Sequence, residues 1–128
     1  MTVLRRILSI TALAAASAAM PAHADTAYDK CVAKGVTNID YSTCGAAMID
    51  RLEASLNATW KSVYGGLPAE AKPALLAEQR LWLAYKEKSC AVYSTGVFGR
   101  EGQVLGSFTC RAKVLTDRIA DLEDLGSG

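Results

Sequence analysis

Hydrophobic spacing in the first half of the chain predicts a long helix. It begins at Asp40 or Ser42, either of which is a suitable N-cap, and continues to Tyr64. Gly65-Gly66 provides a stop signal at its end. The apolar positions that share one helical face are Met48, Leu52, Leu56, Thr59 and Val63. This face is expected to pack against the rest of the protein.

A second helix is predicted from about Pro68 to Tyr93, and it carries two apolar stripes. The first stripe consists of Leu75, Leu76, Trp82, Leu83 and Cys90. The second stripe consists of Leu81, Tyr85 and Val92. Because a helix with one neighbour needs only one apolar face, the two stripes predict contact with more than one neighbouring element.

The last part of the chain predicts a loop followed by a third helix. Residues 94–106 include four glycines within a mixed sequence, which is typical of a loop. The third helix is marked by Phe108, Ala112, Leu115, Ile119 and Leu122. A short helical turn over residues 27–34, ended by Gly35, precedes the three main helices. The predicted fold is therefore all-α, a small antiparallel bundle of three main helices and a short N-terminal helix.

The N-terminus has the pattern of a cleavable secretory signal peptide. Its parts are Arg5-Arg6, an apolar stretch over residues 7–20, Pro21, and the small-x-small sequence Ala22-His23-Ala24. The apolar stretch is shorter than the roughly 20 residues that a membrane-spanning helix needs. We therefore expect removal of residues 1–24, a single domain over residues 25–128, and a periplasmic or secreted bacterial protein without stable membrane insertion.

Removal of residues 1–24 changes the chemistry of the chain. Two of its 14 basic residues and none of its 13 acidic residues are lost, so the formal net charge becomes −1. Without a basic field, binding to nucleic acid is not expected. The single histidine, His23, is lost as well, which excludes histidine-dependent catalysis and histidine metal sites. We assign no catalytic residue, metal ligand or cofactor.

The four cysteines, Cys31, Cys44, Cys90 and Cys110, predict two disulfides in an oxidising compartment. A zinc site is the alternative, but the spacing contains no Cys-x2-4-Cys pair. Antiparallel helices would bring all four cysteines to one end of the bundle, so topology does not select the pairing. The shorter loops favour Cys31 with Cys44 and Cys90 with Cys110, and the other two pairings stay open.

Several motifs resemble a known family of bacterial secreted proteins and lipoproteins. They are Cys44, Leu56-Asn57, the block Gln79-Arg80-Leu81-Trp82-Leu83-Ala84-Tyr85-Lys86-Glu87-Lys88-Ser89-Cys90, Gly106-Ser107, and Cys110 followed by Arg118. This pattern resembles the LprI-like lysozyme-inhibitor family over nearly all of residues 25–128. Lys86-Glu87 stands where the family pattern has Arg-Asp.

The motif residues are expected to be structural. Trp82 and Tyr85 would pack between helices. Asn57 would form a hydrogen bond between helices, and Gln79, Arg80, Lys86 and Glu87 would hold helices together, with Arg118 or Asp117 within reach. The residues with this expected role are Leu56, Asn57, Gln79, Arg80, Trp82, Tyr85 and Arg118.

The resemblance implies a binding protein that inhibits lysozyme or a related peptidoglycan hydrolase. The alternative is an envelope interaction or scaffold module with another partner, and no enzymatic activity is expected in either case. An inhibitor needs a segment that enters the partner's cleft. The predicted loop over residues 94–106 is a candidate, with Phe98 as an apolar anchor and Arg100 as a forked donor. The same loop could instead only connect two helices.

Overall fold

A computed structural model of the protein describes residues 25–128. The predicted signal peptide, with His23 and the expected cleavage after Ala24, lies outside these residues. The described chain contains helices and turns and no strand, which confirms the all-α prediction. Its elements are α1 (Thr26–Val32), α2 (Asn38–Gly66), α3 (Lys72–Lys88), the 3-10 helix η1 (Ala91–Thr95), α4 (Gly99–Glu101), the π-helical turn η2 (Gly102–Gly106) and α5 (Ser107–Gly126).

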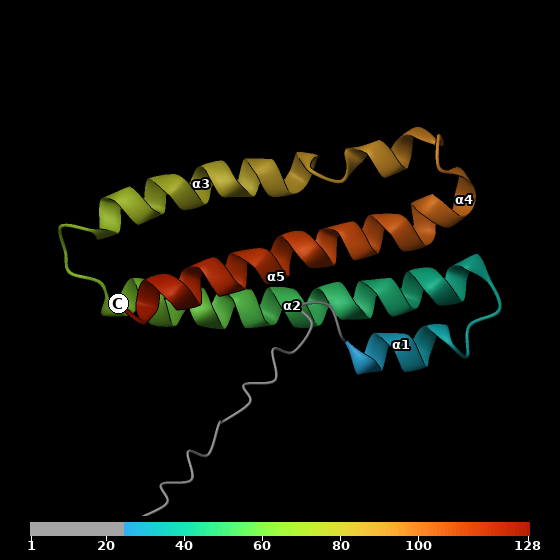
Figure 1. The fold of residues 1–128 in the computed structure, drawn as a ribbon, viewed down its shortest axis with the longest axis horizontal. Helices are drawn as coiled ribbons and strands as arrows, with labels where there is room; N and C mark the ends of the chain where they lie inside the picture. The colour runs from blue at the N-terminus through green and yellow to red at the C-terminus, as the bar shows by residue number, and fades with distance from the viewer. Residues whose placement is uncertain (1–24) are drawn as a thin grey trace, which may run out of the picture.

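The three long helices lie side by side as layers (Figure 1). Helix α5 lies between α2 and α3, and α1 packs along the N-terminal half of α2. The chain reverses direction between α2 and α3 and again between α3 and α5, as predicted for an antiparallel bundle. The interface between α2 and α5 is extensive, whereas α3 contacts α5 at few positions.

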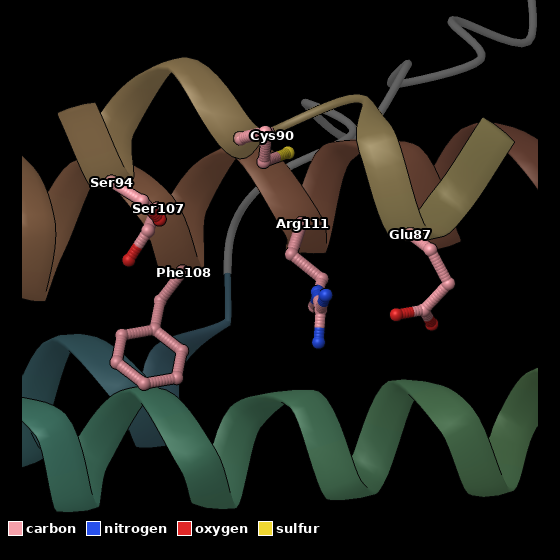
Figure 2. Close-up of a pocket in the computed structure, with 7 residues that line it drawn as sticks. Glu87, Cys90, Ser94, Ser107, Phe108 and Arg111 are labelled. Carbon is pink, nitrogen blue, oxygen red and sulfur yellow. The ribbon is translucent and has the colours of Figure 1, made fainter.

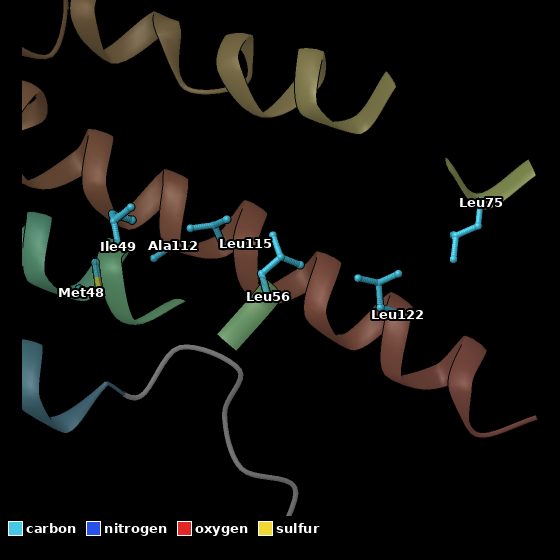
Figure 3. Close-up of a cluster of buried hydrophobic side chains, with 7 residues drawn as sticks. All are labelled: Met48, Ile49, Leu56, Leu75, Ala112, Leu115 and Leu122. Carbon is cyan, nitrogen blue, oxygen red and sulfur yellow. The ribbon is translucent and has the colours of Figure 1, made fainter. Parts of the chain in front are cut away.

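The hydrophobic core fills the space between α2 and α5 (Figure 3). Leu115 and Leu122, one heptad apart on α5, are almost completely buried. Each buried leucine contributes about 1.5–3 kcal/mol relative to an exposed one. The buried cluster consists of Met48, Ile49, Leu56, Leu75, Ala112, Leu115 and Leu122. Only Leu75 in this cluster comes from α3.

Helix α2 begins earlier than predicted. Its N-cap is Thr37, and neither Asp40 nor Ser42 serves as the cap. Thr37 Oγ1 accepts a hydrogen bond from the backbone N–H of Asp40 at 3.2 Å, while Asp40 Oδ2 accepts one from the backbone N–H of Thr37 at 2.9 Å. This reciprocal capping box satisfies two N–H groups of the first turn. Hydrogen bonds from the backbone of Val36 and Thr37 hold the pKa of Asp40 below its ordinary value.

The second predicted helix is shorter than expected at both ends. Residues 68–71 form a turn, and α3 begins at Lys72 with Pro73 in its first turn, where a missing N–H costs nothing. Beyond Lys88 the chain leaves the α-helical conformation near Cys90 and continues as η1. The prediction of one helix from Pro68 to Tyr93 is therefore wrong at its ends.

The predicted loop over residues 94–106 is mostly helical. Only Gly96 to Phe98 lies outside a helical element, and α4 and η2 lead directly into α5. The glycines misled the prediction, because Gly102 and Gly106 serve close packing. A Cβ atom on Gly106 would lie 2.7 Å from Cε1 of Tyr93, and one on Gly102 would collide with the side chain of Phe98. Within residues 25–128, no helix is long and apolar enough to cross a membrane.

Candidate partner-binding surface

Two disulfides tie the outer helices to the α2–α5 core. Cys31–Cys44 joins α1 to α2, with Cα atoms 5.6 Å apart, and Cys90–Cys110 joins the chain after α3 to α5, with Cα atoms 5.9 Å apart. These are the pairs that the shorter loops favour, so the preferred pairing is confirmed. A bridge that closes a loop of this length stabilises a protein by about 3 kcal/mol. Among the described residues, no side-chain cluster could hold a metal ion.

Buried Arg118 connects α5 to α3 through polar contacts. The residue is 4% exposed, and Nε and Nη2 donate to Oε1 of Gln79 at 3.0 and 2.8 Å. Nη1 donates to Glu78 at 2.6 Å. The guanidinium also lies 5.8 Å from the ring of Trp82. Every guanidinium nitrogen of this buried cation therefore has a partner on α3, as burial of a charge requires.

A second ionic contact joins α3 to α2. Lys86 Nζ lies 3.1 Å from Oε1 of Glu53, and the lysine side chain is largely buried. Neither this pair nor the contact of Glu78 with Arg118 was predicted from the sequence. Glu53 and Lys86 are 33 positions apart, and the only signal was the presence of opposite charges on two predicted helices.

Three of the other motif residues, Asn57, Arg80 and Tyr85, are exposed. Asn57 is exposed and forms no side-chain hydrogen bond within the described chain, so the expected helix-to-helix bond is wrong. Arg80 is also exposed and has no ion-pair partner in residues 25–128, so it does not hold helices together. Tyr85 is 58% exposed and does not pack between helices. Leu56 is buried in the core and Trp82 packs against it.

The two residues proposed for partner binding lie in a tight turn at one end of the bundle. We define residues 96–100 as the end turn. Gly96 and Gly99 have φ angles of +83° and +65°, which glycine adopts without strain. Phe98 is half exposed and packs against Tyr93 with ring centroids 5.2 Å apart. Arg100 Nη1 donates to Oε1 of Gln103 at 3.3 Å. The end turn is therefore supported by η1 and η2.

Two hollows lie in this part of the bundle, and one of them includes a residue of the end turn. One, of about 390 Å³, lies between the start of α2 and α4, and Arg100 and Ile39 are on its wall. The other, of about 240 Å³, lies beside the Cys90–Cys110 disulfide, and Glu87 and Arg111 line it (Figure 2). Phe108 lines both. These volumes are at or below the lower end of the range for small-molecule sites and suit single side chains of a protein partner.

Arg111 is a second cation at this end of the bundle. Figure 2 shows its side chain reaching from α5 toward α2, with Glu87 of α3 on the same side. Arg111 forms no ion pair or side-chain hydrogen bond with any residue that the structure describes. The end of the bundle thus offers two arginines, Arg100 and Arg111, beside exposed apolar groups.

Comparison with protein families agrees with these features. The family model described as lysozyme inhibitor LprI matches residues 31–122, which include all four cysteines and Arg118. The chain belongs to the LprI family of lysozyme inhibitors. The LprI match begins at Cys31, the first disulfide residue, and ends at Leu122, the last core residue of α5. No curated protein and no solved structure matches the chain.

Proposed function

We propose that this LprI-family protein is a periplasmic or secreted bacterial binding protein that inhibits a lysozyme-type peptidoglycan hydrolase. The family match over residues 31–122 carries the proposal. The two disulfides support it, because such bonds persist in oxidising compartments outside the cytoplasm. The signal-peptide pattern in residues 1–24 agrees with export. The family is named for inhibition and not for catalysis.

We further propose that the end turn enters the substrate cleft of the hydrolase. Lysozyme cleaves its substrate with two carboxyl groups in a groove, so an inhibitor gains from a cation placed at those acids. Arg100 is exposed at the end turn and offers a forked set of donors that matches a carboxylate. Val97, which is 80% exposed, and Phe98 would supply apolar contact with the cleft walls.

The end turn is suited to this role because its conformation is already supported in the free protein. Phe98 is held against Tyr93, and Arg100 is held by Gln103. A turn that is ordered before binding loses less conformational entropy on association. The hollow with Arg100 on its wall provides a place for a side chain on the rim of a partner's cleft.

The test is lysis of a peptidoglycan suspension by lysozymes of several classes, with the oxidised protein purified after export. Phe98→Ala and Arg100→Ala should each weaken inhibition by about thirtyfold, as expected for a central anchor. Leu125→Ala and Lys61→Ala are matched controls, since both residues are exposed and lie far along the chain from the end turn. Both controls should inhibit like the parent, and circular dichroism should show all four variants folded.

Two negative results have different meanings. If the parent slows lysis by no class of lysozyme, the inhibitor function is wrong for this chain, and an envelope interaction module with another partner takes its place. If the parent inhibits and neither end-turn variant differs from it, the function stands and the end turn is not the binding surface.

A further inference from the structure

Helix α3 presents a mainly apolar face that no element of residues 25–128 covers. In Figure 1, α3 is the outermost layer, with α5 on one side only. Leu81 is 75% exposed and Tyr85 is 58% exposed, although both belong to a regular apolar stripe. We define the outer face of α3 as the exposed residues that share this side of the helix, which are Ala74, Ala77, Leu81, Ala84, Tyr85 and Lys88.

The outer face is distinct from the surface that packs on α5. Leu75 and Trp82 lie about 100° or more around the helix from Leu81 and contact the core. The small residues Ala77 and Ala84 flank Leu81 at helical spacing, so another helix could approach the backbone closely. The sequence therefore provides a second helix-packing surface, as the two predicted stripes indicated, and the described fold leaves it unfilled.

Charges along one edge of the outer face identify the partner that fits. Arg80 and Glu87 are one heptad apart on the same edge. Arg80 has no ionic partner within residues 25–128, and Glu87 has only Lys86 at 3.9 Å. When two identical helices pack antiparallel about a two-fold axis, the same edge of each helix meets. Arg80 of one copy then faces Glu87 of the other, and symmetry repeats this pair.

We propose that two copies of this chain associate through the outer faces of their α3 helices, packed antiparallel. Leu81 of each copy lies against Ala84 of the other, where the small side chain makes room for it. The two Arg80–Glu87 pairs across the interface set the register. They favour the antiparallel arrangement, because a parallel two-fold pair brings opposite edges of the two helices together and these pairs could not form. Lys88 extends past Ala77 of the other copy, with its ammonium in solvent.

The proposed dimer is weak and does not depend on the proposed function. Helix α3 has 17 residues and is about 25 Å long, so this single-helix contact is smaller than a standard interface. We therefore expect a dissociation constant in the micromolar range or weaker. The end turns follow the C-terminal ends of the two α3 helices, which an antiparallel pair places at opposite ends. Dimer formation therefore leaves both end turns free.

The test is sedimentation velocity of the exported, oxidised protein over a concentration series from low micromolar to near millimolar. The average mass of the parent should rise from one chain toward two, and added salt should oppose this rise. Arg80→Glu or Glu87→Arg alone places like charges opposite each other at both symmetry-related contacts. Each single variant should raise the dissociation constant of the dimer by about tenfold. The double variant, Arg80→Glu with Glu87→Arg, restores opposite charges and should restore the parent constant.

Matched variants separate this interface from general effects of charge and folding. Lys61→Glu, a charge reversal on the exposed side of α2, should leave the dimer unchanged. Leu81→Glu should abolish association while helical circular dichroism remains that of the parent. A parent that is monomeric throughout the series would overturn the proposal. It would also be overturned if Arg80→Glu left the dissociation constant unchanged, or if the folded double variant did not recover the association of the parent. If the parent is monomeric and Arg80→Glu alters lysozyme inhibition, the outer face binds the hydrolase and the dimer is rejected.

Discussion

The α2–α5 pair and helix α3 are held in the fold by different forces. Between α2 and α5, apolar side chains such as Leu56, Leu115 and Leu122 are packed in a continuous buried cluster. Helix α3 contributes one residue, Leu75, to that cluster. Trp82 packs against the edge of the cluster, and the other attachments of α3 are the polar contacts of Arg118, the ion pair between Lys86 and Glu53, and the Cys90–Cys110 disulfide.

This difference predicts that mutations in the two regions destabilise the protein in different ways. Loss of an apolar residue between α2 and α5 destabilises the whole fold, because those helices have no other connection of comparable strength. Loss of a polar or covalent attachment of α3 should release that helix while α2 and α5 remain packed.

The largest effect is expected at Leu115, which is 0% exposed. Leu115→Ala leaves a cavity between α2 and α5 and should lower the unfolding free energy by about 2–5 kcal/mol in urea titrations. Leu81→Ala makes the same change on the outer face of α3, and its effect should stay within about 0.5 kcal/mol at low protein concentration. Equal losses for the two variants would contradict the assigned core.

Removal of the disulfide beside α3 should have the next largest effect. Replacing Cys90 and Cys110 together by Ala should lower the unfolding free energy by about 2–4 kcal/mol and retain helical circular dichroism. Amide hydrogen exchange should accelerate in α3 and η1 before α2. The matched control replaces Cys31 and Cys44, which should accelerate exchange in α1 instead. Uniform acceleration in both double variants would show that α3 and α1 are not independent units.

A smaller loss is expected when Gln79 is removed. Gln79→Ala leaves Nε and Nη2 of buried Arg118 without their acceptor and should cost about 1–3 kcal/mol. Arg80→Ala changes the adjacent residue, which is exposed and has no ionic partner among the described residues, so stability should be nearly unchanged. If Arg80→Ala is the more damaging variant, the motif residues have been assigned to the wrong sides of α3.

The smallest effect concerns the capping box at the start of α2. The folded pKa of Asp40 is lowered by hydrogen bonds from Val36 and Thr37, so its carboxylate contributes stability above the unfolded pKa of about 4. That contribution is lost as the pH falls through the folded pKa. Asp40→Asn should therefore lower the urea midpoint at neutral pH, and the difference from the parent should shrink in acid. A constant difference at every pH would exclude a role for the ionised group.

Much of the fold and part of the site could be predicted from local sequence signals. Helical spacing identified the α5 core through Leu115 and Leu122, because a 3.6-residue period defines one face of a helix without reference to its neighbours. Loop length favoured the correct disulfides, since closing a short loop costs less entropy. The family motif also includes Gln79 and Arg118, which the structure places in contact.

Only the tertiary structure decided which apolar and polar side chains are buried in contacts between helices. Both stripes of α3 have the same helical spacing, and contact with α5 selected the one that contains Leu75 and Trp82. Gly102 and Gly106 are residues typical of a loop, yet both lie in helical structure. Phe98 occupies the space that a side chain on residue 102 would need, and Tyr93 occupies the space that one on residue 106 would need. Asn57 is exposed because the neighbouring helices lie on the other side of α2. Spacing defines a face, but only the positions of other helices determine whether that face is buried.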